Sequence, residues 1–132
     1  MEQTLQVGTK GVAEEVVSQE LLATSMKSGN VNVYATPAMI ALMEQAAVNA
    51  LQGFLKEGET SVGTLVNINH LAATPIGVKV RAEAVVKEVN GKKIAFDVVA
   101  FDEKEKIGEG QHHRFILNAE RFQSKANQKV SQ

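Results

Sequence analysis

The feature that most constrains this chain is a long apolar stretch with a single charged side chain, ATPAMIALMEQAAVNALQGFL at residues 35–55. The stretch predicts a buried helix, because its apolar residues recur three and four positions apart. They are Met39, Met43, Ala46, Ala47, Ala50, Leu51 and Phe54. Thr36 and Pro37 form a helix start signal, and Gly53 and Gly58 favour its end. Such a helix is too apolar to be solvated alone, so we expect a sheet to wrap it and a second subunit to help cover it.

Strand patterns occupy most of the remaining sequence. A bent strand is predicted between Thr4 and Val17, and a loop covers residues 18–35. Four further strands are predicted after the helix, and Asn90-Gly91 indicates a tight turn between the second and third of them. Their segments are SVGTLVNINHLAA (61–73), GVKVRAEAVVKEV (77–89), KKIAFDVVAFDE (92–103) and IGEGQHHRFILNAE (107–120). The order of strand, loop, long helix and antiparallel strands predicts an α+β fold.

Length and composition favour one compact domain over residues 1–132, with about 123–132 as a frayed tail. The net charge of −1 comes from 14 basic and 15 acidic residues that are interleaved, which argues against nucleic acid as a partner. The chain has no cysteine and no spacing typical of a metal site, so we expect neither a disulfide nor a bound metal. The N-terminus lacks signal-peptide features and there is no apolar run of about eighteen residues, so we expect a cytoplasmic protein without a membrane segment.

Glu44 is the one charge in the apolar helix, and its neighbours one turn away on either side are apolar. A carboxylate in such surroundings must be paired, hydrogen-bonded or protonated, because burying an unpaired charge is costly. Glu44 therefore either belongs to a functional site or has a structural purpose. The structural alternative is a narrow solvated strip with Gln45, Asn49 and Gln52, or a bond across a subunit interface.

His70 is the only group that titrates near neutrality between Ser61 and Val78, a segment without Lys, Arg, Asp or Glu. A period of two places it on one strand face with four other residues, Val62, Thr64, Val66 and Ile68. A satisfied core histidine is the usual interpretation of such a residue. The functional interpretation gains weight because each of the two most apolar segments of the chain contains a single titratable side chain, Glu44 in one and His70 in the other.

The remaining candidates have strong structural explanations. Thr36 is most simply a helix cap, although a hydroxyl at a helix N-terminus can also orient or attack a carbonyl. Gly63 either weakens its strand or lets a ligand approach the backbone N–H. His112, His113 and Arg114 follow one another on the last strand, where a solvated face is the default and adjacent histidines cannot easily share a metal.

Three of these residues together resemble a known family. Thr36, Glu44 and His70, in this order and spacing and followed by TPIG at 74–77 and a valine-rich alternating strand, resemble the hot-dog-fold thioesterases of the fluoroacetyl-CoA thioesterase-like group. The likeness extends over about residues 4 to 122. It implies a hot-dog fold, in which an antiparallel sheet wraps one long central helix, two subunits pair edge to edge and acyl-CoA binds at the dimer interface.

The resemblance also implies roles for individual residues. Thr36, Glu44 and His70 would be catalytic, while Gly63, through its backbone N–H, and Arg114 would bind substrate. The protein would be a homodimer, with a tetramer as the alternative, and would need no cofactor, since coenzyme A is part of the substrate. One departure is the loop LLATSMKSGNVN, which has no aromatic residue where the family has the aromatic lid associated with recognising fluoroacetate.

We therefore predict an acyl-CoA or related acyl-thioester hydrolase. Glu44 would act as a general base on water or as the nucleophile, Thr36 would position or attack the carbonyl, and His70 would protonate the leaving thiolate. The three side chains should converge on one cleft, either within one chain or with some of them contributed across the dimer. The alternative is a non-catalytic hot-dog protein that binds an acyl thioester or another small apolar ligand, and a third interpretation is a hot-dog dehydratase.

Overall fold

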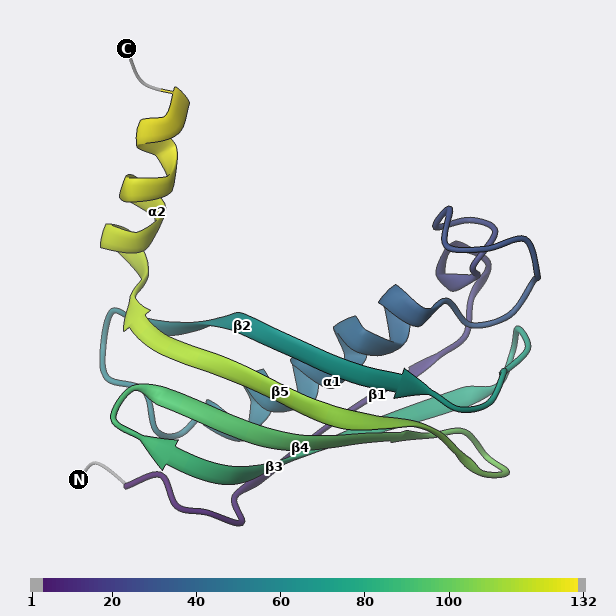
Figure 1. Cartoon of the computed structure of the whole chain (residues 1–132), viewed down its shortest axis with the longest axis horizontal. Helices are drawn as coiled ribbons and strands as arrows, with labels where there is room; N and C mark the ends of the chain where they lie inside the picture. The colour runs from purple at the N-terminus through teal and green to yellow at the C-terminus, as the bar shows by residue number, and fades with distance from the viewer. Residues whose placement is uncertain (1–3, 131–132) are drawn as a thin grey trace.

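One curved antiparallel sheet and one long helix make up the body of the protein. The structure is a computed structural model that describes residues 4–130 (Figure 1). The strands are β1 (Lys10–Val16), β2 (Glu59–His70), β3 (Lys79–Asn90), β4 (Lys93–Phe101) and β5 (Lys106–Asn118), in the spatial order β1-β3-β4-β5-β2. The helices are α1 (Thr36–Leu51) and α2 (Ala119–Asn127), with 3-10 turns η1 (Gln19–Leu21) and η2 (Gln128–Val130). The predicted α+β fold, with an antiparallel sheet around the central helix, is confirmed.

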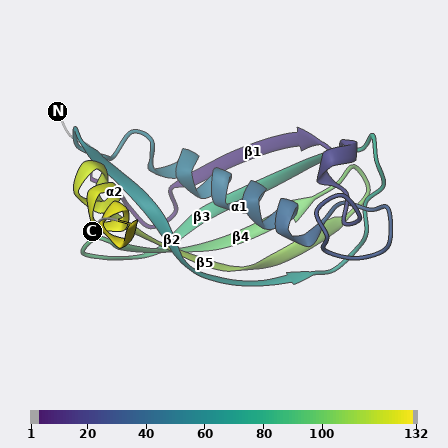
Figure 2. The same cartoon turned by 90° about the horizontal axis from the view of Figure 1, so that it is seen from above.

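Helix α1 lies in the concave side of the sheet, as Figure 2 shows. Its sheet-facing side is buried, whereas Ala41, Gln45 and Asn49 are exposed. The single chain therefore leaves one strip of the helix open, and the expected cover by a second subunit stays a prediction. Glu44 lies at the border of this strip, with 39% of its side chain exposed.

The alternating strands β3 and β4 form the floor beneath α1. Their inward-facing residues are buried, as the period-two pattern predicts: Val80, Ala82, Ala84, Val86, Ile94, Phe96, Val98 and Ala100. The predicted hairpin is confirmed, since Asn90 pairs with Lys93 across a two-residue turn. Gly91 has a φ of +64°, which favours glycine at this turn position.

A β-bulge in β2 corrects the predicted strand face. The pairing of β2 with β5 shifts register between Gly63 and Leu65, so Thr64 is an extra residue in the strand. Directly opposed residues share a face, and Val66 is opposite the buried His112. Val66, Ile68 and His70 therefore face α1, but Val62 and Thr64 do not. The bulge also has a useful consequence, because Gly63 and His70, seven residues apart, both face the helix.

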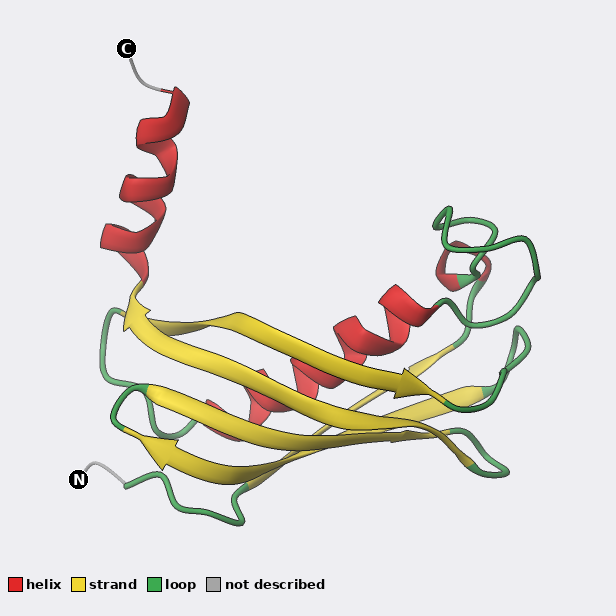
Figure 3. Cartoon of the chain, in the orientation of Figure 1, coloured by secondary structure: helices red, strands yellow, loops and turns green. Residues whose placement is uncertain are grey.

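The two chain ends also differ from prediction. The first strand begins at Lys10 rather than near Thr4. The segment expected to be a frayed tail is helical as far as Val130, and residues 131–132 lie outside the described part of the chain. Helix α2 has no buried residue and stands away from the sheet (Figure 3). No helix within residues 4–130 is long and apolar enough to cross a membrane.

Candidate active site

Thr36 and His70 meet at the N-terminal end of α1. Thr36 is the first residue of the helix, and the N-cap position before it is occupied by Ala35. Instead Thr36 Oγ1 is 2.8 Å from Nδ1 of His70, the last residue of β2. The expectation that Thr36 is simply a helix cap is therefore wrong. The hydrogen bond joins two of the three predicted catalytic side chains.

The second nitrogen of His70 is available for chemistry. Nε2 is shielded from solvent and has no hydrogen-bond partner within the described residues. Burial lowers the pKa of His70, and the backbone of Ala72 acts in the opposite direction. The imidazole is therefore held in its neutral form, in which one nitrogen is a donor and the other an acceptor.

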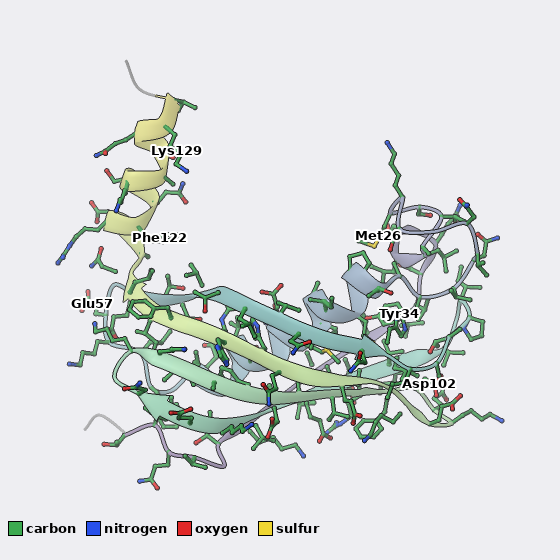
Figure 4. All side chains as sticks on the ribbon, in the orientation of Figure 1. Met26, Tyr34, Glu57, Asp102, Phe122 and Lys129 are labelled. Atoms are coloured by element: carbon green, nitrogen blue, oxygen red, sulfur yellow. The ribbon has the colours of Figure 1, made fainter. Side chains whose placement is uncertain are left out.

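A pocket of about 420 Å³ opens beside this pair. Its walls come from the loop before α1, from Thr36 and from residues 70–73, and they combine apolar side chains with a few polar ones. This mixture is typical of small-molecule sites. Tyr34, labelled in Figure 4, fixes the loop at the helix start. Its hydroxyl donates to Glu15 Oε2 at 2.5 Å, and its backbone N–H donates to Thr74 O at 2.8 Å.

Glu44 belongs to a second cluster, two helical turns further along α1. Its Oε2 accepts from Arg114 Nη1 at 3.4 Å and lies 3.9 Å from His112 Nε2. Gly63 lies directly beneath the carboxylate, because a Cβ atom added there would be 2.7 Å from Glu44 Oε2. Glu44 is thus paired with a permanent positive charge while part of its side chain remains accessible.

Arg114 is buried and held by acceptors from three elements. Its Nε donates to Ser61 Oγ at 2.8 Å, its Nη2 to Ser61 O at 3.0 Å, and its Nη1 contacts both Glu44 and His112 Nε2, the latter at 3.1 Å. Burial lowers the pKa of Arg114, and Glu44 acts in the opposite direction. A buried guanidinium with this many partners can orient a carboxylate very precisely in space.

The structure brings together some predicted site residues and keeps others apart. Thr36 lies with His70, and Glu44 lies with Gly63 and Arg114, as the resemblance implies. The two groups are separated along α1 by eight residues, a rise of about 12 Å. No hydrogen bond or ion pair within residues 4–130 joins them. The expected convergence of all three catalytic side chains is therefore not achieved within one chain.

His112 and Ser61 are site residues that the sequence reasoning missed. The expected solvated face is wrong for His112, which is only 1% exposed and faces the helix. A signal was present, because His112 and Arg114 are two residues apart and so share a strand face. Among residues 4–130, no group of three or more His, Asp or Glu side chains is arranged to hold a metal ion.

Comparison with known proteins identifies the family. The fluoroacetyl-CoA-specific thioesterase family, FlK, matches residues 17–120. The fluoroacetyl-CoA thioesterase of Streptantibioticus cattleyicolor is 40% identical over 98 residues, which are 74% of this chain and 70% of that protein. A solved structure of the fluoroacetyl-CoA thioesterase FlK superposes with a TM-score of 0.92 at 32% identity, covering 97% of this chain and 99% of the other.

The same fold recurs in more distant structures. A hot-dog-like protein from Thermanaerovibrio acidaminovorans matches with a TM-score of 0.84 at 24% identity, over 96% of this chain and 93% of its own. The predicted hot-dog fold is thereby confirmed, and so is the resemblance on which the site residues were assigned. The chain belongs to the fluoroacetyl-CoA-specific thioesterase family.

Proposed function

We propose that the protein is a thioesterase that hydrolyses acyl-CoA thioesters, without a cofactor, at a site built from two copies of the chain. The observation that carries the proposal is the Thr36–His70 hydrogen bond in the wall of the pocket. This pair gives a hydroxyl and a neutral imidazole at a helix N-terminus, a combination that can orient a thioester carbonyl and relay a proton to a leaving thiolate. The family relationship supports the same reaction class.

The edge strand β2 is the surface that best suits a second copy. It is twelve residues long, has no charged residue after Glu59, and leaves Leu65 and Val66 more than 40% exposed. An unpaired edge of this kind is a template for strand addition. The opposite edge, β1, has only seven residues and contains Lys10, Glu14 and Glu15. Charges and shortness disfavour pairing there, so the dimer forms through β2.

A particular register of this pairing would complete the site. If two β2 strands pair antiparallel about a twofold axis that places Asn67 opposite the partner subunit's Asn67, and Thr64 is the extra residue in this pairing too, Gly63 is opposite the partner subunit's His70. Both residues face the α1 side of the sheet, so the imidazole would lie beside the Glu44 carboxylate. Each site then contains Thr36 and His70 from one chain and Glu44, Gly63 and Arg114 from the other.

The chemistry follows from this arrangement. Glu44 takes a proton from water as the oxygen attacks the thioester carbon, or attacks it directly to give an anhydride that water then hydrolyses. The Gly63 N–H and the first N–H groups of α1 stabilise the negative oxygen. The C–S bond breaks, and the thiolate takes up the proton that Glu44 removed from water, relayed through the neutral His70 imidazole; in the anhydride route the hydrolysing water supplies this proton. The products are a carboxylic acid and a free thiol, and Glu44 and His70 return to their starting forms.

Subunit complementation tests both the reaction and the composite site. We would measure thiol release from acetyl-, fluoroacetyl-, branched, aryl and long-chain acyl-CoA with the wild type, with Glu44→Ala and with His70→Ala. Each single variant should lose at least about 100-fold in turnover. A heterodimer of the two variants, purified through two different tags, should recover about half of the wild-type activity, because one of its two sites is intact.

The matched control is a heterodimer of Thr36→Ala with His70→Ala. Both of those residues belong to the same half of the site, so neither of its sites is intact and activity should stay low. Absence of recovery in the Glu44→Ala and His70→Ala heterodimer would overturn the composite site. Tight acyl-CoA binding by the wild type without thiol release would overturn hydrolysis in favour of a binding protein, and an enoyl product would indicate a dehydratase.

A further inference from the structure

His112 is a buried titratable group for which the proposed reaction has no step. Its side chain is 1% exposed, and its ring stacks on Phe96 with the ring centroids 6.2 Å apart. Nδ1 is 2.8 Å from the backbone oxygen of Leu65, and Nε2 is 3.1 Å from Arg114 Nη1. Both nitrogens therefore have partners, and the two partners differ in kind.

These two partners determine which nitrogen is protonated. The Leu65 carbonyl can only accept, so Nδ1 must be protonated and donate to it. The Arg114 guanidinium can only donate, so Nε2 must be unprotonated and accept from it. The neutral Nδ1–H tautomer satisfies both contacts, whereas the imidazolium would direct a second N–H at the guanidinium.

The contact with His112 restricts where Arg114 can direct its remaining donors. Ser61 holds the guanidinium on one side through Nε and Nη2, and His112 holds Nη1 on the other. The same Nη1 reaches Glu44 Oε2. Without the acceptor at Nε2, Nη1 would keep only the long contact to Glu44, at 3.4 Å, and its position would be less well determined.

We infer that His112 is a positioning residue, which holds the Arg114 guanidinium as a neutral acceptor so that the Glu44 carboxylate keeps its place over Gly63. The inference rests on the proposed role of Glu44 in hydrolysis. It adds a residue that touches no substrate and acts through Arg114. The β-bulge is part of the device, because the Leu65 carbonyl that selects the tautomer follows the extra residue in β2.

Protonation of His112 at Nε2 would remove the acceptor for Arg114 Nη1 and break the contact between the two side chains. The charged groups that face it are Arg114 on its own strand and Glu44 on α1, and His113 adjoins it. Burial lowers the pKa of His112, the Leu65 carbonyl raises it, the charge of Arg114 lowers it, and Glu44 raises it. The net effect is a lowered pKa, so the acceptor persists below the ordinary histidine range and is lost only at acid pH.

Two conservative substitutions separate the two contacts of His112. His112→Gln places an amide oxygen near the position of Nε2 and keeps an acceptor for Arg114. His112→Asn places an amide nitrogen near the position of Nδ1 and keeps the donor to Leu65. His113→Gln is the matched control, because His113 is the next residue and faces the opposite side of the sheet.

The kinetic result should distinguish positioning from simple packing. We expect His112→Asn to lower kcat on the order of 10- to 100-fold with little change in KM, and His112→Gln and His113→Gln to keep most of the activity. The melting temperatures of the variants should not follow the same order as their kcat values. Activity retained by His112→Asn but lost by His112→Gln would overturn the inference and assign His112 to anchoring the bulge.

A spectroscopic measurement tests the inference without any substrate. Nitrogen-15 NMR of the imidazole groups in the wild type should show one histidine with Nδ1 protonated and Nε2 unprotonated, whose signals vanish in His112→Gln. A protonated Nε2 at neutral pH would overturn the inference even if thiol release is confirmed. If that tautomer is found but the wild type releases no thiol, the proposed function fails while the contact with Arg114 stands.

Discussion

At the scale of single residues, the absence of a side chain at Gly63 gives the Glu44 carboxylate the space that it occupies. An added methyl group would be 2.7 Å from Glu44 Oε2 and 3.1 Å from His112 Cε1. The carboxylate is the far end of a flexible side chain, so it can move away at little cost in stability. It cannot move away and keep its position for catalysis.

We therefore expect Gly63→Ala to lower kcat/KM on the order of 100-fold while the melting temperature changes little. Steady-state kinetics and thermal unfolding of the same preparation would check this. Thr64→Ala is the control, because Thr64 is the extra residue of the bulge and does not face α1. Equal losses in both variants would mean that the strand, rather than the space over Gly63, determines activity.

Residue by residue, the sequence identified the groups that stand out against an apolar background. Glu44 and His70 were found because each is the single titratable group in its segment, and the structure gives each a polar partner. His112 was missed because it follows Gln111 and precedes two basic residues, so its segment looks solvated. The one signal that places His112 on the buried face is its spacing of two residues from Arg114, which puts both side chains on the same side of the strand.

At the scale of elements, the packing of α1 on β1 depends on Gly11. A methyl group there would be 2.1 Å from Ala46 O and 2.4 Å from Ala50 N, both backbone atoms of the helix. Backbone atoms cannot rotate away as a side chain can, so the whole helix would have to shift.

Gly11→Ala should lower the free energy of unfolding by about 3 kcal/mol or more. Urea unfolding at fixed protein concentration would measure the change. Gly29→Ala is the matched control, since its nearest contact would be Ala23 Cβ at an ordinary 3.6 Å. A Gly11→Ala variant as stable as this control would show that α1 and β1 do not pack as closely as described.

Elements were predictable from sequence where burial is regular. Strands β3 and β4 alternate in burial as they alternate in sequence, and α1 carries an unbroken apolar stripe. The bulge in β2 was not predictable. Thr64 as an extra residue changes which side chains face the helix, but nothing in the composition of the strand marks it. Helix α2 was missed because it has no buried face. Its remaining signal is local, the cap at Asn118, whose side chain accepts from the Arg121 N–H at 2.9 Å.

At the scale of the whole molecule, the two edges of the sheet differ in how well they suit pairing with another strand. The short, charged edge β1 disfavours it, and the long edge β2 favours it. The single chain leaves three features unmatched: the edge strand β2, which has no charged residue after Glu59, the open strip of α1, and two separate groups of candidate site residues along the helix. A single twofold pairing through β2 would address all three. The sequence pointed to this only indirectly, through a helix too apolar for one sheet to cover.

The whole molecule should also lose stability in mildly acid solution because of two histidines, the buried His112 and the half-buried His70. The pKa values of His70 and His112 are both lowered from the ordinary 6.5, chiefly by burial. Below pH 6.5 the unfolded chain therefore binds protons that the native state does not, and the free energy of unfolding falls as the pH falls. The carboxylates with lowered pKa values, such as Glu83 and Asp102, add to this loss only in more acid solution, below their ordinary values of 4.5 and 3.8.

The window between pH 6.5 and 5 therefore isolates the histidines. Urea unfolding across this window, at fixed protein concentration, should show a steady loss of stability in the wild type and a flatter profile in a His70→Gln, His112→Gln double variant. His113→Gln should keep the wild-type slope, which controls for a general effect of removing an imidazole. A double variant with the full wild-type slope would mean that other groups take up the protons, and that the two imidazoles are not held neutral by the fold.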